Sequence, residues 1–238
     1  MKKLLLFSLF TLFIPLTIQA QGDYWQGGIF VGGTAFSGDV NPESTPDLSD
    51  LGYSIGLVGR VDITNKIGFR GSLSYGQFKG DDLNYDNVDR QRRGFNFETT
   101  IIELVGVAEW EPFAADRYYT DAKGSVVMDK LVSPYLFAGA GLGFANLNTD
   151  YSGYNGNNEA FMDLIRQDRA EGNTQMAFVV PFGIGSKFDI SNHITLALEF
   201  GGRLVFSDYL DGISQSGNPG SNDLYFVSGL MFYYRFFN

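Results

Sequence analysis

The sequence predicts an all-β fold, an eight-stranded antiparallel transmembrane β-barrel, from three observations. Apolar residues alternate with small or polar residues over long segments, short and long connections alternate between these segments, and 30 glycines accompany 16% aromatic residues. A strand of about 9 to 11 tilted residues crosses a bilayer, whereas strands of globular proteins are usually about five or six residues long. Long two-faced strands therefore favour a barrel of the outer-membrane type, with lipid outside and a packed polar interior.

The chain begins with the pattern of a secretory signal peptide. Lys2 and Lys3 precede an apolar run, and Ala20 supplies the small residue before a cleavage site. We therefore expect residues 1–20 to be a cleaved signal peptide and residues 21–238 to form one outer-membrane β-barrel domain. Cleavage of this segment removes two lysines and no acidic residue, which changes the net charge of the protein from -10 to -12. A protein this acidic is not expected to bind nucleic acid.

Eight segments show the alternating pattern, and single-chain bacterial barrels have an even number of strands. In chain order they are 24–36, 51–63, 67–76, 95–110, 133–147, 176–190, 193–206 and 224–237. The sixth segment is the clearest, because Phe178, Phe182 and Ile184 share one tall apolar face. Gly183 and Lys187 lie on the opposite face, which we expect to line the interior.

The connections between the segments support the same topology. Long connections are expected at 37–50, 79–94, 148–175 and 207–223, and short turns at 64–66 and 191–192. Such barrels have short periplasmic turns and long outer loops, so both termini should lie in the periplasm, below four extracellular loops. The connection 112–132 is too long for a tight turn, and we interpret it as a periplasmic excursion. A short helix is expected near 158–166.

The fourth segment has two apolar faces, which makes its orientation less obvious. Ile102, Leu104 and Trp110 lie on the cleaner apolar face, so Glu103 and Glu109 on the other face should point inward. Aromatic residues should form girdles at the two membrane boundaries. The expected members are Tyr24, Trp25, Trp110, Phe188, Phe232, Tyr234 and Phe236 at one end, and Tyr75, Phe95, Phe97 and Phe206 at the other.

Charged residues are expected inside the barrel. They are Arg60, Arg70, Glu103, Glu109, Lys187, Glu199, Arg203 and Arg235. Side chains fill the interior of a barrel of about eight strands, so these residues should pair with one another and fix the strand register. A proton or ion path is the alternative interpretation.

The residue inventory argues against an enzyme. Cysteine is absent, which excludes lipoprotein acylation, disulfides and thiolate chemistry. His193 is the only histidine, and it lies beside the periplasmic turn at 191–192. A lipid-modifying barrel with a serine, histidine and carboxylate triad would need histidine near the outer leaflet. We therefore expect no catalytic residues and no cofactor; lipid chemistry at His193 remains a third alternative.

An acidic run in the second long connection invites comparison with a calcium loop. Asp82, Asn84 and Asp86 have the opening spacing of such a loop. Asn87 stands where the loop needs glycine, and Arg93 where it needs a bidentate glutamate. No metal site is therefore expected.

Arg90, Arg92 and Arg93 follow this acidic run. A guanidinium group matches the geometry of a phosphate, so these residues are candidates for contact with lipopolysaccharide phosphates just above the outer rim. The alternative is a solvated loop base.

Short stretches along nearly the whole mature chain resemble one family. They are Gly38-Asp39, Tyr75-Gly76, Gly80-Asp81-Asp82, the approach from Arg90 to Gly94 into Phe97 and Glu103, the run from Pro134 to Gly139, Glu171-Gly172, the run from Pro181 to Gly185, and the run from Asp208 to Asp211. Their order resembles the small outer-membrane β-barrel family of Bacteroidetes that includes PorG of the type IX secretion system. Gly212 departs from the second acidic residue that family members often carry there.

The resemblance implies a non-enzymatic, multi-pass protein of the cell outer membrane, in contact with lipid and lipopolysaccharide. It further implies a structural or docking component of type IX secretion that meets periplasmic secretion-ring proteins. The alternative is a small surface barrel whose extracellular loops bind ligand or lipopolysaccharide and support envelope integrity.

Overall fold

The computed structural model describes residues 25–37, 50–84, 88–114, 118–120, 122, 126–128, 132–217 and 223–236. The expected signal peptide, Tyr24 and most of the first long connection lie outside the described residues. Asp86 and Asn87 of the acidic run also lie outside them, as does much of the connection 112–132.

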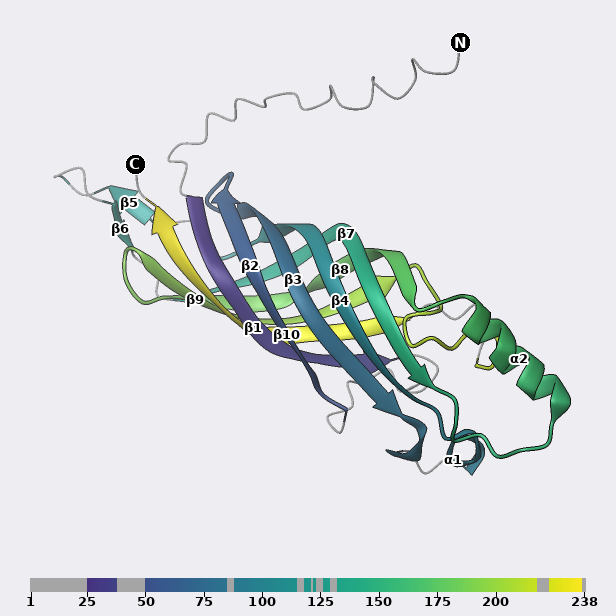
Figure 1. Cartoon of the computed structure of the whole chain (residues 1–238). Coiled ribbons are helices and arrows are strands. Elements are labelled where there is room, and N and C mark those ends of the chain that lie inside the picture. Colours follow the sequence, from purple (N-terminus) through teal and green to yellow (C-terminus); the bar gives the residue numbers. More distant parts are fainter. Residues whose placement is uncertain are drawn as a thin grey trace, which may run out of the picture.

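Eight strands close into one antiparallel barrel (Figure 1). They are β1 Trp25–Ser37, β2 Gly52–Asp62, β3 Ile67–Asp81, β4 Asn96–Trp110, β7 Val132–Asp150, β8 Thr174–Asp189, β9 Ile194–Val205 and β10 Leu224–Phe236. Each strand pairs with its neighbours along the chain, and β1 pairs with β10 to close the sheet. The predicted eight-stranded antiparallel barrel is therefore confirmed.

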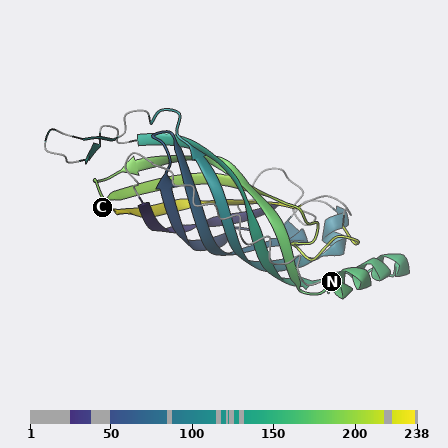
Figure 2. The ribbon, with the colours of Figure 1, turned by 90° about the horizontal axis from the view of Figure 1, so that it is seen from above.

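Smaller elements lie at the two ends of the barrel (Figures 1 and 2). The 3-10 helix η1, Asp82–Asn84, and the helix α1, Val88–Arg93, connect β3 to β4, and α2, Glu159–Ala170, lies between β7 and β8. At the opposite end, β5 Tyr118–Thr120 and β6 Val126–Met128 form a two-stranded sheet between β4 and β7. We refer to these ends as outer and periplasmic, following the loop pattern.

The expected helix near 158–166 is present as α2, which continues to Ala170. Asn158 begins it, because its side chain accepts hydrogen bonds from the backbone N–H groups of Ala160 at 3.1 Å and Phe161 at 3.3 Å. Capping of this kind satisfies donors that the first helical turn leaves unpaired.

The predicted orientation of the fourth segment is confirmed. On β4, Leu104 is 59% exposed on the outer wall, whereas Glu103 is 3% exposed inside the barrel. Along β8, Phe178, Phe182 and Ile184 are exposed and Lys187 is buried. The alternation follows from the pleat of a strand, which points successive side chains to opposite faces.

The apolar outer wall has a sharp limit toward the outer end. Tyr75, Ile102, Phe144 and Met176 are exposed and are successive cross-strand partners on β3, β4, β7 and β8. The next outward-facing row consists of Gln77, Thr100, Asn146 and Thr174. Lys79, Glu98 and Asn148 form the row after that. These strands therefore continue beyond the apolar belt with a polar outer face.

The interior changes in the opposite sense. We call the part of the barrel beyond the row of Tyr75 and Ile102 the outer zone. Inside it Phe36, Phe78 and Phe97 pack together, with Phe36 and Phe78 stacked at a ring distance of 5.1 Å. The placement of Phe95 and Phe97 in an outer girdle is wrong, because they are 0% and 3% exposed. A polar wall suits contact with water, so in this zone the apolar side chains turn inward, as in a soluble protein.

The apolar belt between the two boundaries has the height typical of outer-membrane barrels. Trp25, Trp110 and Phe236 are exposed at the periplasmic end, as predicted. From Trp110 to Ile102 the strand covers about 27 Å at roughly 3.4 Å per residue. A tilt of about 35 to 45° reduces this to about 21 Å along the barrel axis, close to the apolar band of about 25 Å typical of such barrels.

Candidate functional site

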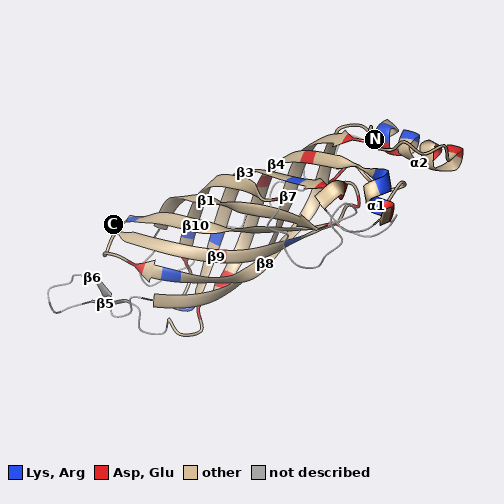
Figure 3. Cartoon of the chain, turned by 90° about the horizontal axis from the view of Figure 1, so that it is seen from below, with Lys and Arg blue, Asp and Glu red and all other residues tan. Residues whose placement is uncertain are grey.

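Figure 3 shows Lys, Arg, Asp and Glu residues on the strands of the barrel. The buried Glu109 contacts three of the buried cations in the periplasmic half. Its carboxylate lies 2.7 Å from Arg60 Nε, 2.9 Å from Arg70 Nε and 2.5 Å from Lys187 Nζ. These four buried residues come from β4, β2, β3 and β8. We call them, together with Asp62, Glu111, Glu199 and Tyr135, the inner charge network.

Two acidic members of the inner charge network were missed in the sequence. Glu111 accepts hydrogen bonds from Arg60 Nη2 at 2.7 Å and Lys187 Nζ at 2.6 Å, and Asp62 lies 2.6 Å from Arg60. Glu111 follows the last residue of β4, two positions beyond Glu109. The same period of two that placed Glu109 inside could have identified it.

The inner charge network extends toward the middle of the barrel through Arg70. Its Nη2 lies 2.6 Å from Glu199 Oε2, which also accepts a hydrogen bond from the Tyr135 hydroxyl at 3.0 Å. The Arg70 guanidinium lies 5.3 Å from the centre of the Phe137 ring. These contacts connect Arg70 on β3 and Tyr135 on β7 to Glu199 on β9.

The remaining predicted interior charges form two separate pairs. Arg235 Nη2 lies 3.0 Å from Asp189 Oδ1, a residue that the sequence analysis did not select. Arg203 lies 3.6 Å from Glu103, which accepts a hydrogen bond from the Tyr225 hydroxyl at 2.5 Å. All eight predicted residues are therefore buried in the barrel, in three groups.

The outer mouth of the barrel is covered by residues 207–217, which we call the outer cap. Leu210 and Ile213 are completely buried there and join the hydrophobic core of the outer zone. The Thr99 hydroxyl donates a hydrogen bond to the Leu210 carbonyl at 2.7 Å, and the Tyr151 hydroxyl donates one to the carbonyl of Gly212. Among the described residues, buried side chains of the outer cap and of the inner charge network thus occupy the interior at both ends of the barrel.

Asp168 on α2 holds the outer cap in place. Its buried carboxylate accepts hydrogen bonds from the backbone N–H groups of Gln215 at 2.8 Å and Ser216 at 2.9 Å. The Tyr209 hydroxyl donates to the Asp168 carbonyl. Burial raises the pKa of Tyr209 and, more strongly, that of Tyr151, so both hydroxyls remain protonated donors at neutral pH.

Arg90, Arg92 and Arg93 lie on α1, beyond the outer ends of β3 and β4. Arg93 is held by Asp82, whose two carboxylate oxygens each lie 2.7 Å from its guanidinium group. Arg92 is 76% exposed and 4.0 Å from Asp89. Asp82, the first residue of the considered calcium loop, is thus a partner of Arg93.

Two other sequence expectations concern residues outside these groups. His193 is exposed at the β8–β9 turn at the periplasmic end, with its ring 5.9 Å from that of Tyr234. Across the described ranges, no three His, Asp or Glu side chains come together in an arrangement suited to a metal ion. Among the same residues, no helix has the length and apolar character needed to span a membrane.

Several solved structures have a similar architecture. For Ail, the attachment invasion locus protein of Yersinia pestis, in complex with the heparin analogue sucrose octasulfate, the TM-score is 0.44 at 13% identity over 90% of this chain and 99% of that one. Neisserial surface protein A has a TM-score of 0.45 and 12% identity, over 90% of this chain and 97% of its own. The outer membrane protein OprG from Pseudomonas aeruginosa has a TM-score of 0.41 and 10% identity, over 91% of this chain and 97% of its own.

No curated protein matches the chain. A family model described as a domain of unknown function, DUF6089, matches residues 2–238. The chain therefore belongs to the DUF6089 family.

Proposed function

We propose that this chain is a non-enzymatic protein of the outer membrane that serves as a docking component of type IX protein secretion, similar to PorG. The apolar belt between Trp110 and Ile102 supports insertion in a bilayer, since a closed barrel satisfies every backbone group within lipid. The observation that carries the docking role is a filled barrel with an extended periplasmic connection. A barrel whose interior is packed with side chains has no open pore, so we look for its function in the surfaces at its two ends.

The connection between β4 and β7 is the candidate docking surface. The other two turns at this end are tight: Ile63 N–H donates to Ile67 O at 2.9 Å, and Ile190 N–H donates to Ile194 O at 2.9 Å. Between β4 and β7 the chain instead forms the β5–β6 sheet (Figure 2). Strand edges pair readily with a partner segment, and a periplasmic protein would meet this sheet first.

Replacing residues 115–131 with a short Gly-Ser linker tests the docking role. We expect loss of co-purification with periplasmic secretion-ring proteins and reduced export of secretion substrates. Heat-modifiable migration in gels should show that the barrel still folds. The matched control replaces the exposed outer residues 155–157 and should leave both readouts unchanged. Unchanged co-purification without residues 115–131 would contradict the proposal.

A second candidate function is binding of an extracellular ligand or lipopolysaccharide at α1, in support of envelope integrity. The observation that favours it is a cavity of about 560 Å³ lined by Arg90, Arg92 and Arg93. Replacing Arg90 and Arg92 with alanine should increase sensitivity to detergents and leave secretion intact. Arg93 is spared because it anchors Asp82. Wild-type detergent resistance in the double variant would argue against this function.

A further inference from the structure

The cavity beside α1 combines cationic and aromatic side chains. We call it the arginine cavity; it is lined by Asp89, Arg90, Arg92, Arg93, Tyr154, Asn158 and Phe161. Its lining contains three arginines and one aspartate, and Asp82 pairs with Arg93 beside it, so that three arginines stand against two aspartates, although the chain as a whole has a net charge of -10. The local charge therefore favours an anionic ligand.

Contacts between two loops preorganise the arginine cavity. Gly94, with φ of +60°, approaches the backbone of Gly153 so closely that a Cβ on Gly153 would lie 2.0 Å from the Gly94 carbonyl oxygen. Asp82 holds the Arg93 guanidinium 5.1 Å from the Phe95 ring centre. A site whose backbone and one of whose arginines, Arg93, are already held in place loses less entropy when a ligand binds.

Aromatic rings form one side of the arginine cavity. The rings of Tyr154 and Phe161 lie 4.8 Å apart, and Phe161 stacks on Phe95 at 6.3 Å. Tyr154 and Phe161 are only partly buried. Such rings offer an apolar face with a polar edge, which suits the C–H face of a sugar ring, while guanidinium groups match phosphate or carboxylate.

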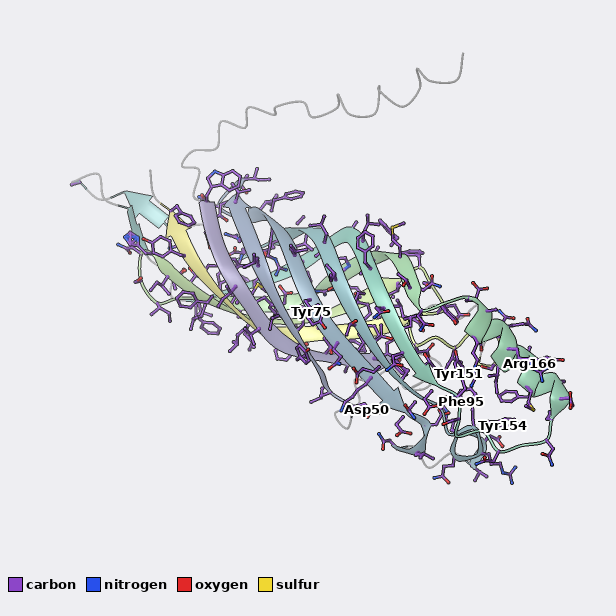
Figure 4. All side chains as sticks on the ribbon, in the orientation of Figure 1. Asp50, Tyr75, Phe95, Tyr151, Tyr154 and Arg166 are labelled. Atoms are coloured by element: carbon purple, nitrogen blue, oxygen red, sulfur yellow. The ribbon has the colours of Figure 1, made fainter. Side chains whose placement is uncertain are left out.

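The height of the arginine cavity distinguishes among anionic ligands. Tyr75 belongs to the last apolar row, and β3 continues from there to Asp81, about 20 Å along the strand. With a tilt of about 35 to 45°, this is about 15 Å beyond the apolar belt. Figure 4 shows Tyr75 on the barrel wall, far from Tyr154 near α1. The headgroup region is only about 5 to 8 Å thick on each side.

We infer that the arginine cavity binds an acidic saccharide that carries phosphate or carboxylate, well above the phosphates at the membrane surface. This inference rests on the second candidate function and specifies its ligand. The sequence placed the contact of these arginines with lipopolysaccharide phosphates just above the outer rim. We place it higher instead, at the level of the sugars on the cell surface. The saccharide belongs either to the core of the cell's own lipopolysaccharide or to a soluble glycan.

Binding measurements on the full-length protein in nanodiscs test the inference. The probes are core oligosaccharide released from the cell's own lipopolysaccharide by mild acid, lipopolysaccharide without core sugars, an oligogalacturonate and inorganic phosphate. Arg92→Ala should weaken saccharide binding by about tenfold, as expected for loss of a charge-assisted hydrogen bond, and Tyr154→Leu should weaken it as well. The matched control is Arg166→Ala, since Arg166 is also exposed and also paired three residues away, with Asp163.

Each outcome has a defined meaning. Preferential binding of core oligosaccharide identifies the cell's own lipopolysaccharide, and preferential binding of oligogalacturonate identifies an external glycan. The inference is overturned if neither saccharide binds, if phosphate binds as tightly as the saccharides, if coreless lipopolysaccharide alone binds, or if Arg92→Ala and Arg166→Ala behave alike. Detergent sensitivity of the Arg90 and Arg92 double variant without saccharide binding would retain the second candidate function and reject this ligand.

Discussion

Glu109 shows how single residues specify this barrel. It contacts Arg60, Arg70 and Lys187 from three other strands. Each contact forms only when the strands hold one register, because a shift of one residue turns every side chain to the opposite face. Buried ion pairs add little net stability compared with apolar residues, yet a charge left without its partner is very unfavourable. The inner charge network therefore penalises incorrect registers.

Replacing Glu109 with alanine should lower the free energy of unfolding by about 3 to 5 kcal/mol, because three buried cations lose a shared carboxylate. Urea unfolding in micelles, followed by tryptophan fluorescence, measures the change. The matched control is Glu98→Ala on the exposed face of the same strand, where only a hydrogen bond from Gln77 is lost. It should change stability by about 0.5 kcal/mol or less. Equal losses in both variants would disprove the central role of Glu109.

The tyrosines of the outer cap predict a pH dependence. Burial raises the pKa of Tyr151 and Tyr209 above the usual 10.0, so the folded state keeps protons that the unfolded state releases above about pH 10. The cap should therefore be fully stable below about pH 10 and lose stability as the pH rises further. Subtilisin cleavage within residues 207–217 should accelerate between pH 9 and 11, to a smaller degree in Tyr151→Phe. Equal wild-type cleavage rates at both pH values would refute this assignment.

The strands, and the face to which each side chain points, were predictable because apolar and polar side chains alternate with a period of two residues along a barrel wall. The error at Phe95 and Phe97 has a physical cause. Alternation shows which residues share a face but not where lipid gives way to water. Below that boundary the apolar face points out, and above it the apolar face points in. Leu104 and Phe97 therefore lie on opposite faces of β4, although both are apolar.

The outer cap could not be predicted from local patterns, and neither could its clamp, by which we mean the hydrogen bonds that Asp168 accepts from Gln215 and Ser216. Asp168 and Gln215 meet across 47 positions of sequence, and a lone aspartate on an amphipathic helix is ordinarily solvated. Residues 207–217 read as a polar loop in the sequence, although aspartate side chains, among them Asp211 and Asp223, accept hydrogen bonds from their backbone N–H groups. The ion pairs were more accessible to prediction, since charges on an inward face of a narrow barrel must find partners.

Removing the clamp should free the outer cap without unfolding the barrel. In Asp168→Ala, the backbone N–H groups of Gln215 and Ser216 lose their acceptor. Hydrogen exchange should then accelerate around Leu210 and Ile213 and remain slow in the strands. Asp163→Ala provides the control, because Asp163 is exposed on the same helix and pairs with Arg166. Unchanged exchange in Asp168→Ala would show that the clamp is unnecessary.

The two parts of the barrel place their apolar side chains on opposite faces of the wall. The periplasmic half has an apolar wall around an interior that holds the buried charges, and the outer zone has a polar wall around the outer part of the hydrophobic core. The outer zone carries α1, α2 and the arginine cavity beyond the apolar belt, and the other end carries the β5–β6 sheet. Under the two functions proposed above, the barrel would be a rigid spacer between a docking surface at one end and a ligand site at the other.

A filled barrel should not conduct. Liposomes that contain the protein should swell in a small sugar no faster than empty liposomes, in contrast to liposomes that contain a general porin. Removal of residues 209–216 should not open a path, because the inner charge network still fills the periplasmic half. Rapid swelling with the wild-type protein would exclude a purely structural interior.

Accessibility along β4 distinguishes an apolar wall that faces lipid around a packed interior from the reverse arrangement. The chain has no cysteine, so single cysteines at Ile102, Leu104, Val105, Val107 and Ala108 can carry one spin label each in lipid vesicles. We predict that labels at 102, 104 and 108 collide readily with oxygen and poorly with a water-soluble nickel complex. Labels at 105 and 107 should be immobile and shielded from both reagents. Access of the nickel complex to 104 and 108, or oxygen-rich mobile labels at 105 and 107, would contradict the account.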